Sequence, residues 1–230
     1  VNQAIVLDNS KYLNKIIEID EKNLTCIVEP GVVLDELNRQ LKPLGLWFPV
    51  DVSTSSRATI GGMAGNNSAG GRSIKYGIMR DNVLSINTIL SDTSKAHFGL
   101  VKKDLSGLED IFPKLIKIAE KSQKEIVTRF PKVLRRVGGY NLDALLPDTL
   151  ASRPGSLGNE NDINLSHLLV GSEGTLAYST TIELKLSPLP PPKIMALCHF
   201  STFYEAMDSA QYIVKIDPIA VELIDSTMIS

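Results

Sequence analysis

Residues 49–77 constrain the fold more than any other stretch of the chain, because six of these residues are glycines. Each glycine adds conformational entropy that folding must remove, so a surface loop without a role is the less favoured explanation. We interpret the stretch as a long loop, too rich in glycine for a core element and too often interrupted by apolar residues for a flexible linker. Where no Cβ intervenes, backbone N–H groups can lie close to phosphate oxygens. The stretch therefore predicts a site for a large, planar, anionic ligand.

Other nucleotide-binding and nucleophile motifs are absent. The sequence has no Gly-Lys dipeptide, which excludes a P-loop, and Ile60–Gly65 carries Ile where a Rossmann fingerprint needs its first glycine. No Gly-x-Ser-x-Gly elbow occurs. The histidines at positions 97, 167 and 199 lie far apart, and we interpret each as a surface or hydrogen-bonded side chain. We interpret the acidic residues as dispersed over solvated faces.

Charge and cysteine content exclude further classes of function. The formal net charge of −2 gives no basic field for nucleic acid. No apolar run reaches the ~18 residues of a transmembrane helix, so we expect a cytoplasmic protein, either free or peripheral to a membrane. Cys26 and Cys198 are isolated, so we expect no metal site and two buried thiols in a reducing compartment.

Hydrophobic periodicity predicts the main elements. We expect strands at 4–7, 24–28, 83–90, 165–170 and 176–186. We expect helices at 33–41, ended by Pro43 and Gly45, and within 104–130, with Pro113 in the first turn. Residues 11–17 are predicted as a connector, 150–164 as an exposed loop, and 187–192 as a stiff polyproline-like spacer. Both ends look cut, since 4–7 and 218–224 are apolar, so we expect a fragment of a longer protein.

Several segments together resemble one known family. They are Thr25–Val32, Phe48–Asp51, Thr59–Gly70, Lys75–Gly77, Arg136–Asp143 and Leu169–Leu176. In this order and spacing they resemble the FAD-binding domain of the vanillyl-alcohol oxidase/p-cresol methylhydroxylase type. The resemblance is strongest to its D-lactate, glycolate and 2-hydroxyglutarate dehydrogenase branch, some members of which carry an iron–sulfur region downstream.

The resemblance implies an α+β fold in which two α+β subdomains hold FAD, followed by a substrate-binding cap domain. On that basis residues 1–48 are the remainder of the first subdomain, 49–190 the second, and 191–230 the start of the cap. The fold would be truncated at its N-terminus and would lack most of the C-terminal cap. The catalytic residues are expected in the missing cap. We therefore expect FAD to be weakly bound or absent in this fragment, and the fragment alone to be inactive.

The resemblance also implies site residues. The expected cofactor-binding residues are Pro49, Val50, Asp51, Thr54, Thr59, Gly61, Gly62, Asn66, Asn67, Gly70, Tyr76, Gly77, Gly171, Ser172, Glu173, Gly174 and Thr175. Tyr140 and Asn141 are expected on the substrate side, although a plain turn after a helix would also explain that pair. Three positions depart from the family pattern, namely Val52, Ala69 and Ser179.

The implied activity is oxidation of a D-2-hydroxy acid such as D-lactate to the 2-oxo acid, with hydride transfer to flavin. The electrons would pass to a quinone, a cytochrome, an electron-transfer flavoprotein or an iron–sulfur partner. Two alternatives stay open: another oxidoreductase on the same flavin fold, and a non-catalytic scaffold domain.

Overall fold

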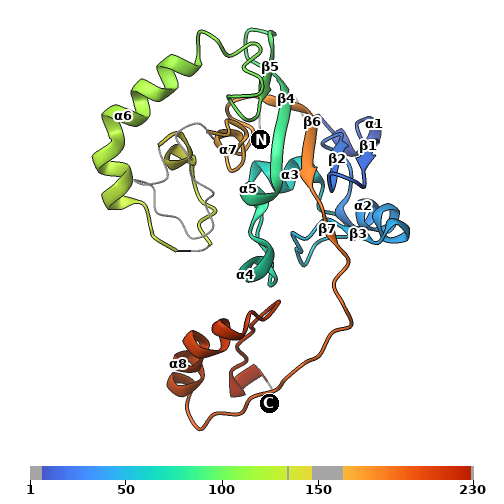
Figure 1. Ribbon diagram of the computed structural model, residues 1–230, viewed down its shortest axis with the longest axis vertical. Helices are drawn as coiled ribbons and strands as arrows, with labels where there is room; N and C mark the ends of the chain where they lie inside the picture. Colours follow the sequence, from blue (N-terminus) through green and yellow to red (C-terminus); the bar gives the residue numbers. More distant parts are fainter. Residues whose placement is uncertain (1–6, 134, 147–162, 229–230) are drawn as a thin grey trace.

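A five-stranded antiparallel sheet forms the centre of the protein, as the computed structural model shows for residues 7–133, 135–146 and 163–228 (Figure 1). Its strand order is β1-β2-β6-β4-β5. The strands are β1 (Ile16–Asp20), β2 (Thr25–Val28), β4 (Val83–Ile89), β5 (Lys95–Phe98) and β6 (Tyr178–Lys185). A separate two-stranded sheet pairs β3 (Leu46–Trp47) with β7 (Ser187–Pro188).

Helices and single turns surround this sheet. The α-helices are α1 (Asn9–Tyr12), α2 (Leu34–Leu41), α3 (Ile60–Gly65), α4 (Ser73–Tyr76), α5 (Met79–Asn82), α6 (Phe112–Arg129), α7 (Ser166–Leu169) and α8 (Phe203–Ile213). The 3-10 turns are η1 (Lys42–Leu44), η2 (Leu142–Leu145), η3 (Val214–Ile216) and η4 (Ser226–Met228). Helix α3 contacts β6, and α5 and α7 contact β4. These short helices therefore pack against β4 and β6, two neighbouring strands that lie far apart in the sequence.

The hydrophobic core lies between the sheet and these helices. Val28, Ile182 and Leu184 on the strands are fully buried together with Leu37 of α2 and Ile60 of α3. Strand β6 is central because β2 and β4 flank it, with Val28 and Ile86 both opposite Ile182. Residues on both sides of position 48 thus share one sheet, while the division into subdomains at 1–48 and 49–190 stays a prediction.

Most elements with clear periodicity are confirmed. Strands β2, β4 and β6 lie within the predicted segments 24–28, 83–90 and 176–186. Helix α2 buries Leu34, Leu37 and Leu41 on one face and is followed by a turn that contains Pro43. Helix α6 lies within the predicted segment 104–130, begins at Phe112 and has Pro113 in its first turn, as expected. Of the segments predicted at 4–7 and 150–164, residues 4–6 and 150–162 lie outside the described residues.

Three predictions about local structure are wrong. Most of the predicted strand 165–170 forms helix α7 (Ser166–Leu169), and the predicted connector 11–17 contains the end of α1 and the start of β1. The glycine-rich stretch is not only a loop, because α3 lies within it and buries Ile60, Met63 and Ala64 in the core. Helix α3 lies so close to the turn after β2 that a Cβ at Gly61 would lie 2.6 Å from Cβ of Pro30. Glycine here permits core packing.

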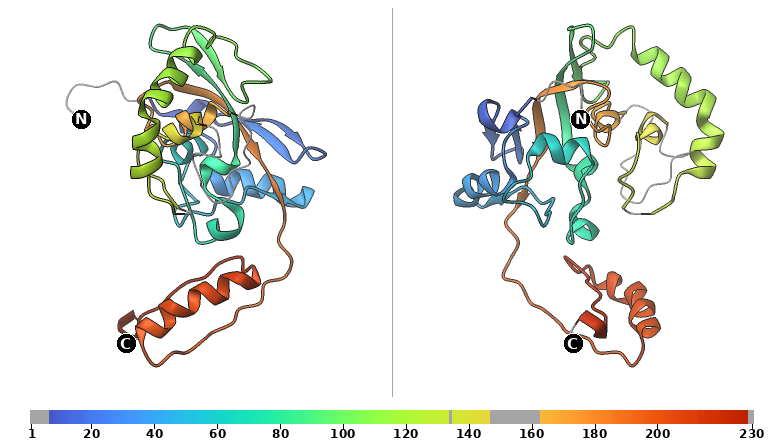
Figure 2. Two further views of the ribbon diagram at one scale, coloured as in Figure 1. Left: turned by 60° about the vertical axis from the view of Figure 1, so that its left-hand side comes forward. Right: turned by 180° about the vertical axis from the view of Figure 1, so that it is seen from behind.

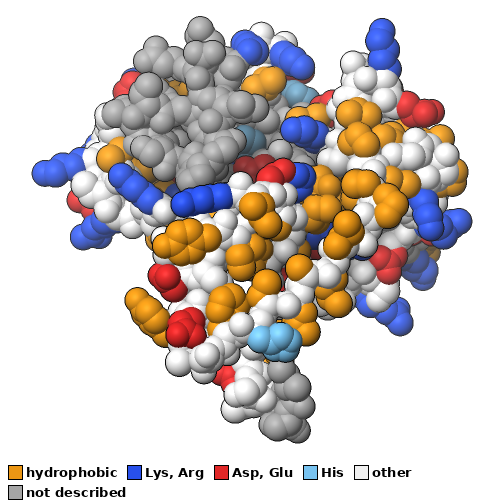
Figure 3. Space-filling model, turned by 60° about the horizontal axis from the view of Figure 1, so that its bottom comes forward, with side chains coloured by type: hydrophobic (Ala, Val, Ile, Leu, Met, Phe, Trp, Pro, Cys, Tyr) orange, Lys and Arg blue, Asp and Glu red, His pale blue; other side chains and the backbone are white. Residues whose placement is uncertain are grey.

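The C-terminal residues form an arm outside the main body. An extended stretch after β7 leads to α8, which lies beyond the lower end of the sheet (Figures 1 and 2). Helix α8 buries no residue, and large apolar side chains of the arm are exposed, as the view from this end shows (Figure 3). Lys75 of α4 forms an ion pair with Asp217 of the arm. Assignment of 191–230 to a cap domain stays a prediction.

The two cysteines differ, and this corrects the expectation of two buried thiols. Cys26 on β2 is 1% exposed, and burial followed by the nearby Glu183 charge raises the pKa of its thiol to about 12. Cys198 in the extended stretch is exposed. A thiolate is the reacting species, so burial and a raised pKa both suppress reaction at Cys26.

We expect a thiol reagent at pH 8 to modify Cys198 rapidly and Cys26 only after unfolding. The number of protein thiols that react, counted with and without denaturant, measures this. The Cys198→Ser variant is the control and should lose the fast phase entirely. Two equivalents that react at one rate in the native protein would contradict the structure.

Candidate functional site

A pocket of about 190 Å³ opens between α3, the turn that follows α7, and the first residues of β6. Its lining residues are Asn9, Pro30, Gly61, Ala64, Gly65, Ile86, Leu169, Ser172, Gly174, Ala177, Tyr178 and Ser179. None of them carries a formal charge at neutral pH. The hydroxyl of Tyr178 donates a hydrogen bond to Oδ1 of Asn9 at 2.7 Å, which joins two sides of the pocket.

Helix α3 is the first wall of the pocket, and its start is fixed by hydrogen bonds to its first N–H groups. The Thr59 hydroxyl caps the helix by accepting a hydrogen bond from the Gly62 N–H at 3.3 Å. The Gly61 N–H donates to the carbonyl of Pro30 at 2.7 Å, and the Ile60 N–H donates to that of Val32 at 2.8 Å. The Pro-Gly turn after β2 thereby sets the position of α3.

The turn at Gly171–Thr175 is the second wall. Its Gly171 and Glu173 N–H groups each donate at 2.9 Å, to the carbonyls of Ala64 and Gly65 at the end of α3. Gly171 and Gly174 have φ angles of +88° and +71°, which glycine adopts without steric cost. The two walls are therefore hydrogen-bonded to one another, although they lie about a hundred residues apart in the sequence.

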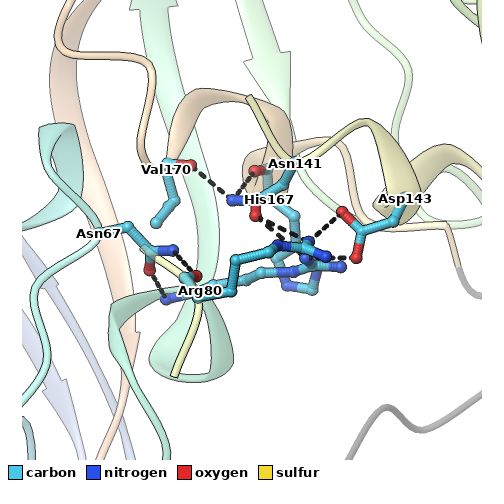
Figure 4. Close-up of polar contacts among 7 residues, drawn as sticks. Asn67, Arg80, Asn141, Asp143, His167 and Val170 are labelled. Atoms are coloured by element: carbon cyan, nitrogen blue, oxygen red, sulfur yellow. Dashed lines mark hydrogen bonds and ion pairs between the residues drawn. The ribbon is translucent and has the colours of Figure 1, made fainter. Parts of the chain in front are cut away.

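A buried ion cluster lies behind this turn (Figure 4). The Asp143 carboxylate accepts hydrogen bonds from Arg80 at 2.8 Å and from Arg136 at 2.5 Å. Burial on its own would raise the pKa of Asp143, but the Arg80 charge and hydrogen bonds from both guanidinium groups outweigh it, and the pKa lies below its ordinary value. Arg136 also stacks on the ring of Phe130, with 4.7 Å to the ring centroid.

Two asparagines link the ion cluster to the two walls (Figure 4). The Asn141 amide N–H group donates to the carbonyls of Val170 at 2.8 Å and His167 at 3.1 Å. Asn67, just beyond α3, accepts from the Arg80 backbone N–H at 3.0 Å and donates to the Arg136 carbonyl at 3.3 Å. Asn67 has a φ of +52°, a conformation that asparagine tolerates better than most residues.

More than half of the site residues predicted from the sequence either line the pocket or support its walls. Gly61, Ser172 and Gly174 line the pocket. The predicted residues that build the walls or their supports are Thr59, Gly62, Asn67, Tyr140, Asn141, Gly171, Glu173 and Thr175. The Tyr140 and Thr175 hydroxyls share a hydrogen bond of 2.7 Å, so Tyr140 contacts the turn directly.

The remaining predicted residues do not line this pocket. They are Pro49, Val50, Asp51, Thr54, Asn66, Gly70, Tyr76 and Gly77. Val50 is fully buried in the core, and Asp51 forms an ion pair with Arg72 at 3.3 Å. Tyr76 meets the Trp47 ring edge-on, with centroids 5.2 Å apart. Their contact with a cofactor stays a prediction.

Sequence reasoning missed the ion cluster, and the expectation that acidic residues lie on solvated faces is wrong for Asp143. A signal was present, because Asp143 lies in the apolar run Leu142-Asp-Ala-Leu-Leu146, where a carboxylate needs a buried partner. For the histidines the expectation holds at His97, which shares a hydrogen bond of 2.8 Å with Asn87, and at the exposed His199.

Within residues 7–133, 135–146 and 163–228, no three His, Cys, Asp or Glu side chains gather as metal ligands would. In the same ranges no helix is both long and apolar enough to cross a membrane.

Comparison with known proteins defines the class. Residues 1–98 match the sequence model of the FAD binding domain family. A solved structure of alkyldihydroxyacetonephosphate synthase, of the p-cresol methylhydroxylase type, covers the fold with a TM-score of 0.54 over 91% of this chain and 28% of that chain, at 20% identity. Residues 1–98 are therefore similar to an FAD binding domain, and the chain shares the α+β fold of the p-cresol methylhydroxylase type with that solved structure, which confirms the resemblance.

Three curated relatives are similar to this chain over nearly its whole length. D-2-hydroxyglutarate dehydrogenase of Escherichia coli is 31% identical over the whole chain, which spans 22% of that relative. Glycolate oxidase subunit GlcD of Bacillus subtilis is 30% identical over 95% of the chain and 34% of its own length. The probable mitochondrial D-lactate dehydrogenase of Danio rerio is 29% identical over 99% of the chain and 36% of its own length. The chain thus spans between about a fifth and about a third of these relatives.

Proposed function

We propose that this chain supplies the FAD-binding part of a dehydrogenase that oxidises a D-2-hydroxy acid to the 2-oxo acid. The observation that carries the proposal is the pocket between α3 and the Gly171–Thr175 turn, in a chain whose first 98 residues match an FAD binding domain. The similarity to D-2-hydroxyglutarate dehydrogenases over the full length of the chain favours a D-2-hydroxydicarboxylic acid as substrate.

The lining residues fit part of an FAD molecule. Small or uncharged groups line the pocket, and such surfaces suit a planar ring system with hydrogen-bonding edges. At Gly174 a Cβ would meet no atom within 4 Å, and at Gly65 its nearest neighbour would be Cα of Glu173 at 4.0 Å. Open space therefore lies beside these two lining positions, and glycine leaves it unfilled.

When bound, FAD would supply the hydride acceptor for the reaction. The residues of this chain would bind and orient that group, with the Ser172 hydroxyl as a donor or acceptor of hydrogen bonds. Among the described lining residues there is no carboxylate or imidazole, and the Tyr178 hydroxyl is already hydrogen-bonded to Asn9. We therefore propose that the base for the substrate hydroxyl comes from the cap domain.

The size of the pocket supports weak binding by this chain alone. Its volume of about 190 Å³ is smaller than the ~300–1,000 Å³ of a typical ligand site. The pocket would hold only one part of the dinucleotide, and the rest would need contacts beyond it. We propose that FAD binds weakly to the isolated chain, and a fully yellow protein after gel filtration would contradict this.

We expect Gly65→Leu to raise the dissociation constant for FAD at least about tenfold, a loss of about 1.4 kcal/mol, because the added side chain fills the pocket. Flavin fluorescence titration measures the constant. Gly138→Leu is the matched control, since a Cβ at Gly138 meets nothing within 4 Å and Gly138 does not line the pocket. Thermal unfolding checks that both variants fold. Equal affinity in Gly65→Leu and wild type would remove the pocket from the FAD site.

The activity is tested with the full-length protein. Reduction of one dye acceptor is measured with D-2-hydroxyglutarate, D-lactate and glycolate in turn. The proposal predicts turnover with D-2-hydroxyglutarate and slower turnover with glycolate. FAD binding without turnover of any of the three would favour a different oxidoreductase, and no FAD binding at all would favour a scaffold.

We propose a redox protein partner or a quinone as the physiological acceptor, and a cytoplasmic or peripheral membrane location.

A further inference from the structure

We propose that the ion cluster of Asp143, Arg80 and Arg136 is a positioning device that sets the geometry of both pocket walls through Asn141 and Asn67. That FAD is the ligand of the pocket rests on the proposed function, whereas the claim about the geometry of the walls concerns this chain alone. Asn141 and Asn67 contact the backbone around the turn and the end of α3, and the three charged residues act through them. All five are therefore positioning residues and not catalytic ones.

The cluster is buried. The side chains of Asp143, Arg80 and Arg136 are 3%, 7% and 14% exposed. The Asp143 carboxylate faces both guanidinium groups. The Asn141 amide oxygen faces the same two groups, because it accepts from Arg80 at 3.1 Å and from Arg136 at 3.5 Å.

This contact fixes which way the Asn141 amide points. With its oxygen toward two cations, its NH₂ group must face the opposite side, where it donates to the carbonyls of His167 and Val170. Both carbonyls lie in the last turn of α7 or just after it, where no further helical turn follows to satisfy them. The arginines therefore orient a double donor onto the end of α7.

The peptide group between Val170 and Gly171 is consequently held from both sides. Its carbonyl accepts from Asn141 at 2.8 Å, and its N–H donates to the Ala64 carbonyl in α3 at 2.9 Å. The plane of this peptide bond is rigid, so fixing its orientation also fixes where the turn leaves α7. The Asn141 amide thereby determines how the second wall meets the first.

Asn67 provides the matching connection on the α3 side. Its side chain bridges the backbone of Arg80 and the backbone of Arg136, and therefore lies between the two segments that carry the arginines. A Cβ at Gly171 would lie 3.3 Å from Cβ of Asn67, so the turn packs directly on this residue. The cluster thus holds the α3 exit and the α7 exit in one frame.

Stability alone does not require such a cluster. Well-packed apolar side chains often replace a buried ion cluster without loss of stability. Apolar side chains cannot, however, orient an amide, and orientation is what the contacts around Asn141 provide. We infer that the charges act on geometry.

The test is amide hydrogen exchange at residue resolution on the full-length protein without flavin. Asp143→Asn keeps the side-chain shape and removes the charge, and Asn141→Asp keeps an acceptor for the arginines but loses both donors. For each we expect exchange at Gly171 and Glu173 to rise at least about tenfold, while exchange in the β2–β6 ladder changes far less. Asp143→Glu restores the charge and should restore most of the protection.

Glu36→Gln is the matched control, because it removes the carboxylate of an exposed ion pair with Arg39 and should leave Gly171 unchanged. Equal acceleration in the turn and in the ladder would show a general loss of stability and overturn the proposal, as would unchanged exchange at Gly171. If Asp143→Asn does not fold, Asn141→Asp decides between these outcomes. Loosening of the turn with unaltered FAD affinity would uphold the positioning role and refute the proposed ligand of the pocket.

Discussion

Replacement of Gly70 by alanine is expected to lower the free energy of unfolding by at least about 3 kcal/mol. A Cβ at this position would overlap the backbone carbonyl oxygen and the carboxylate of Asp51. Neither group can move easily, since Asp51 also accepts from the Arg72 N–H at 3.1 Å and Gly70 itself donates to the Ser73 hydroxyl at 2.9 Å. The glycine at this position is thus required by packing, whatever its relation to a ligand.

Urea unfolding of Gly70→Ala beside Gly138→Ala measures this effect. A Cβ at Gly138 would meet no atom within 4 Å, so that control should stay within about 0.5 kcal/mol of wild type. If Gly70→Ala and Gly138→Ala unfold at the same urea concentration as wild type, the close approach of residues 51 and 70 is wrong.

The second large effect is expected at the ion cluster. Asp143→Ala leaves two largely buried guanidinium groups without their carboxylate, which typically costs about 3–5 kcal/mol. The exposed pair between Glu36 and Arg39 provides the comparison, since its loss in Glu36→Gln should cost only about 0.2–1 kcal/mol. A similar cost at both sites would mean that the cluster is solvated in solution.

The same cluster gives a pH dependence with a definite sign. The pKa of Asp143 is lowered from its ordinary value of 3.8, because the two arginines outweigh burial. Its contribution to stability is therefore complete above that value and is lost as the pH falls below it toward the folded-state pKa. Urea unfolding at descending pH should show wild type losing stability more steeply than Asp143→Ala in this range. Parallel curves would contradict the lowered pKa.

Elements with a strong period were predictable from the sequence. The spacing of Leu34, Leu37 and Leu41 identified α2, strand-like alternation identified β4, and the run after the Gly171–Gly174 turn identified β6. Each pattern is local, so neighbouring residues alone specify it. Pro43 and Pro113 similarly marked helix boundaries because proline lacks an N–H.

Elements that depend on distant contacts were not predictable in this way. Helix α3 contains three glycines in six residues, yet it forms because Thr59 caps it and Pro30 accepts from Gly61. Helix α7 has only four residues, too few for a helical period to stand out from an apolar strand. The pairing of Asp143 with Arg80 spans 63 positions, and no local pattern reports it.

The candidate site was predictable only in part, because some of its features are local in the sequence and others depend on distant contacts. The segment around Gly61 stood out by its glycine content and Gly171–Thr175 by the family resemblance, and in the structure the two segments are hydrogen-bonded to one another. Composition could not separate Gly61, which lines the pocket, from Gly70, which packs against Asp51. That distinction needs coordinates, because both glycines permit close approach and only the approaching group differs.

The central claim is that α3 and the Gly171–Thr175 turn form the surface on which FAD binds. Amide hydrogen exchange of the full-length protein with and without saturating FAD tests it most directly. The account predicts new protection at residues 60–65 and 171–175, and none in the distant helix α6. Protection confined to other segments, or no protection at an FAD concentration that saturates binding, would contradict it.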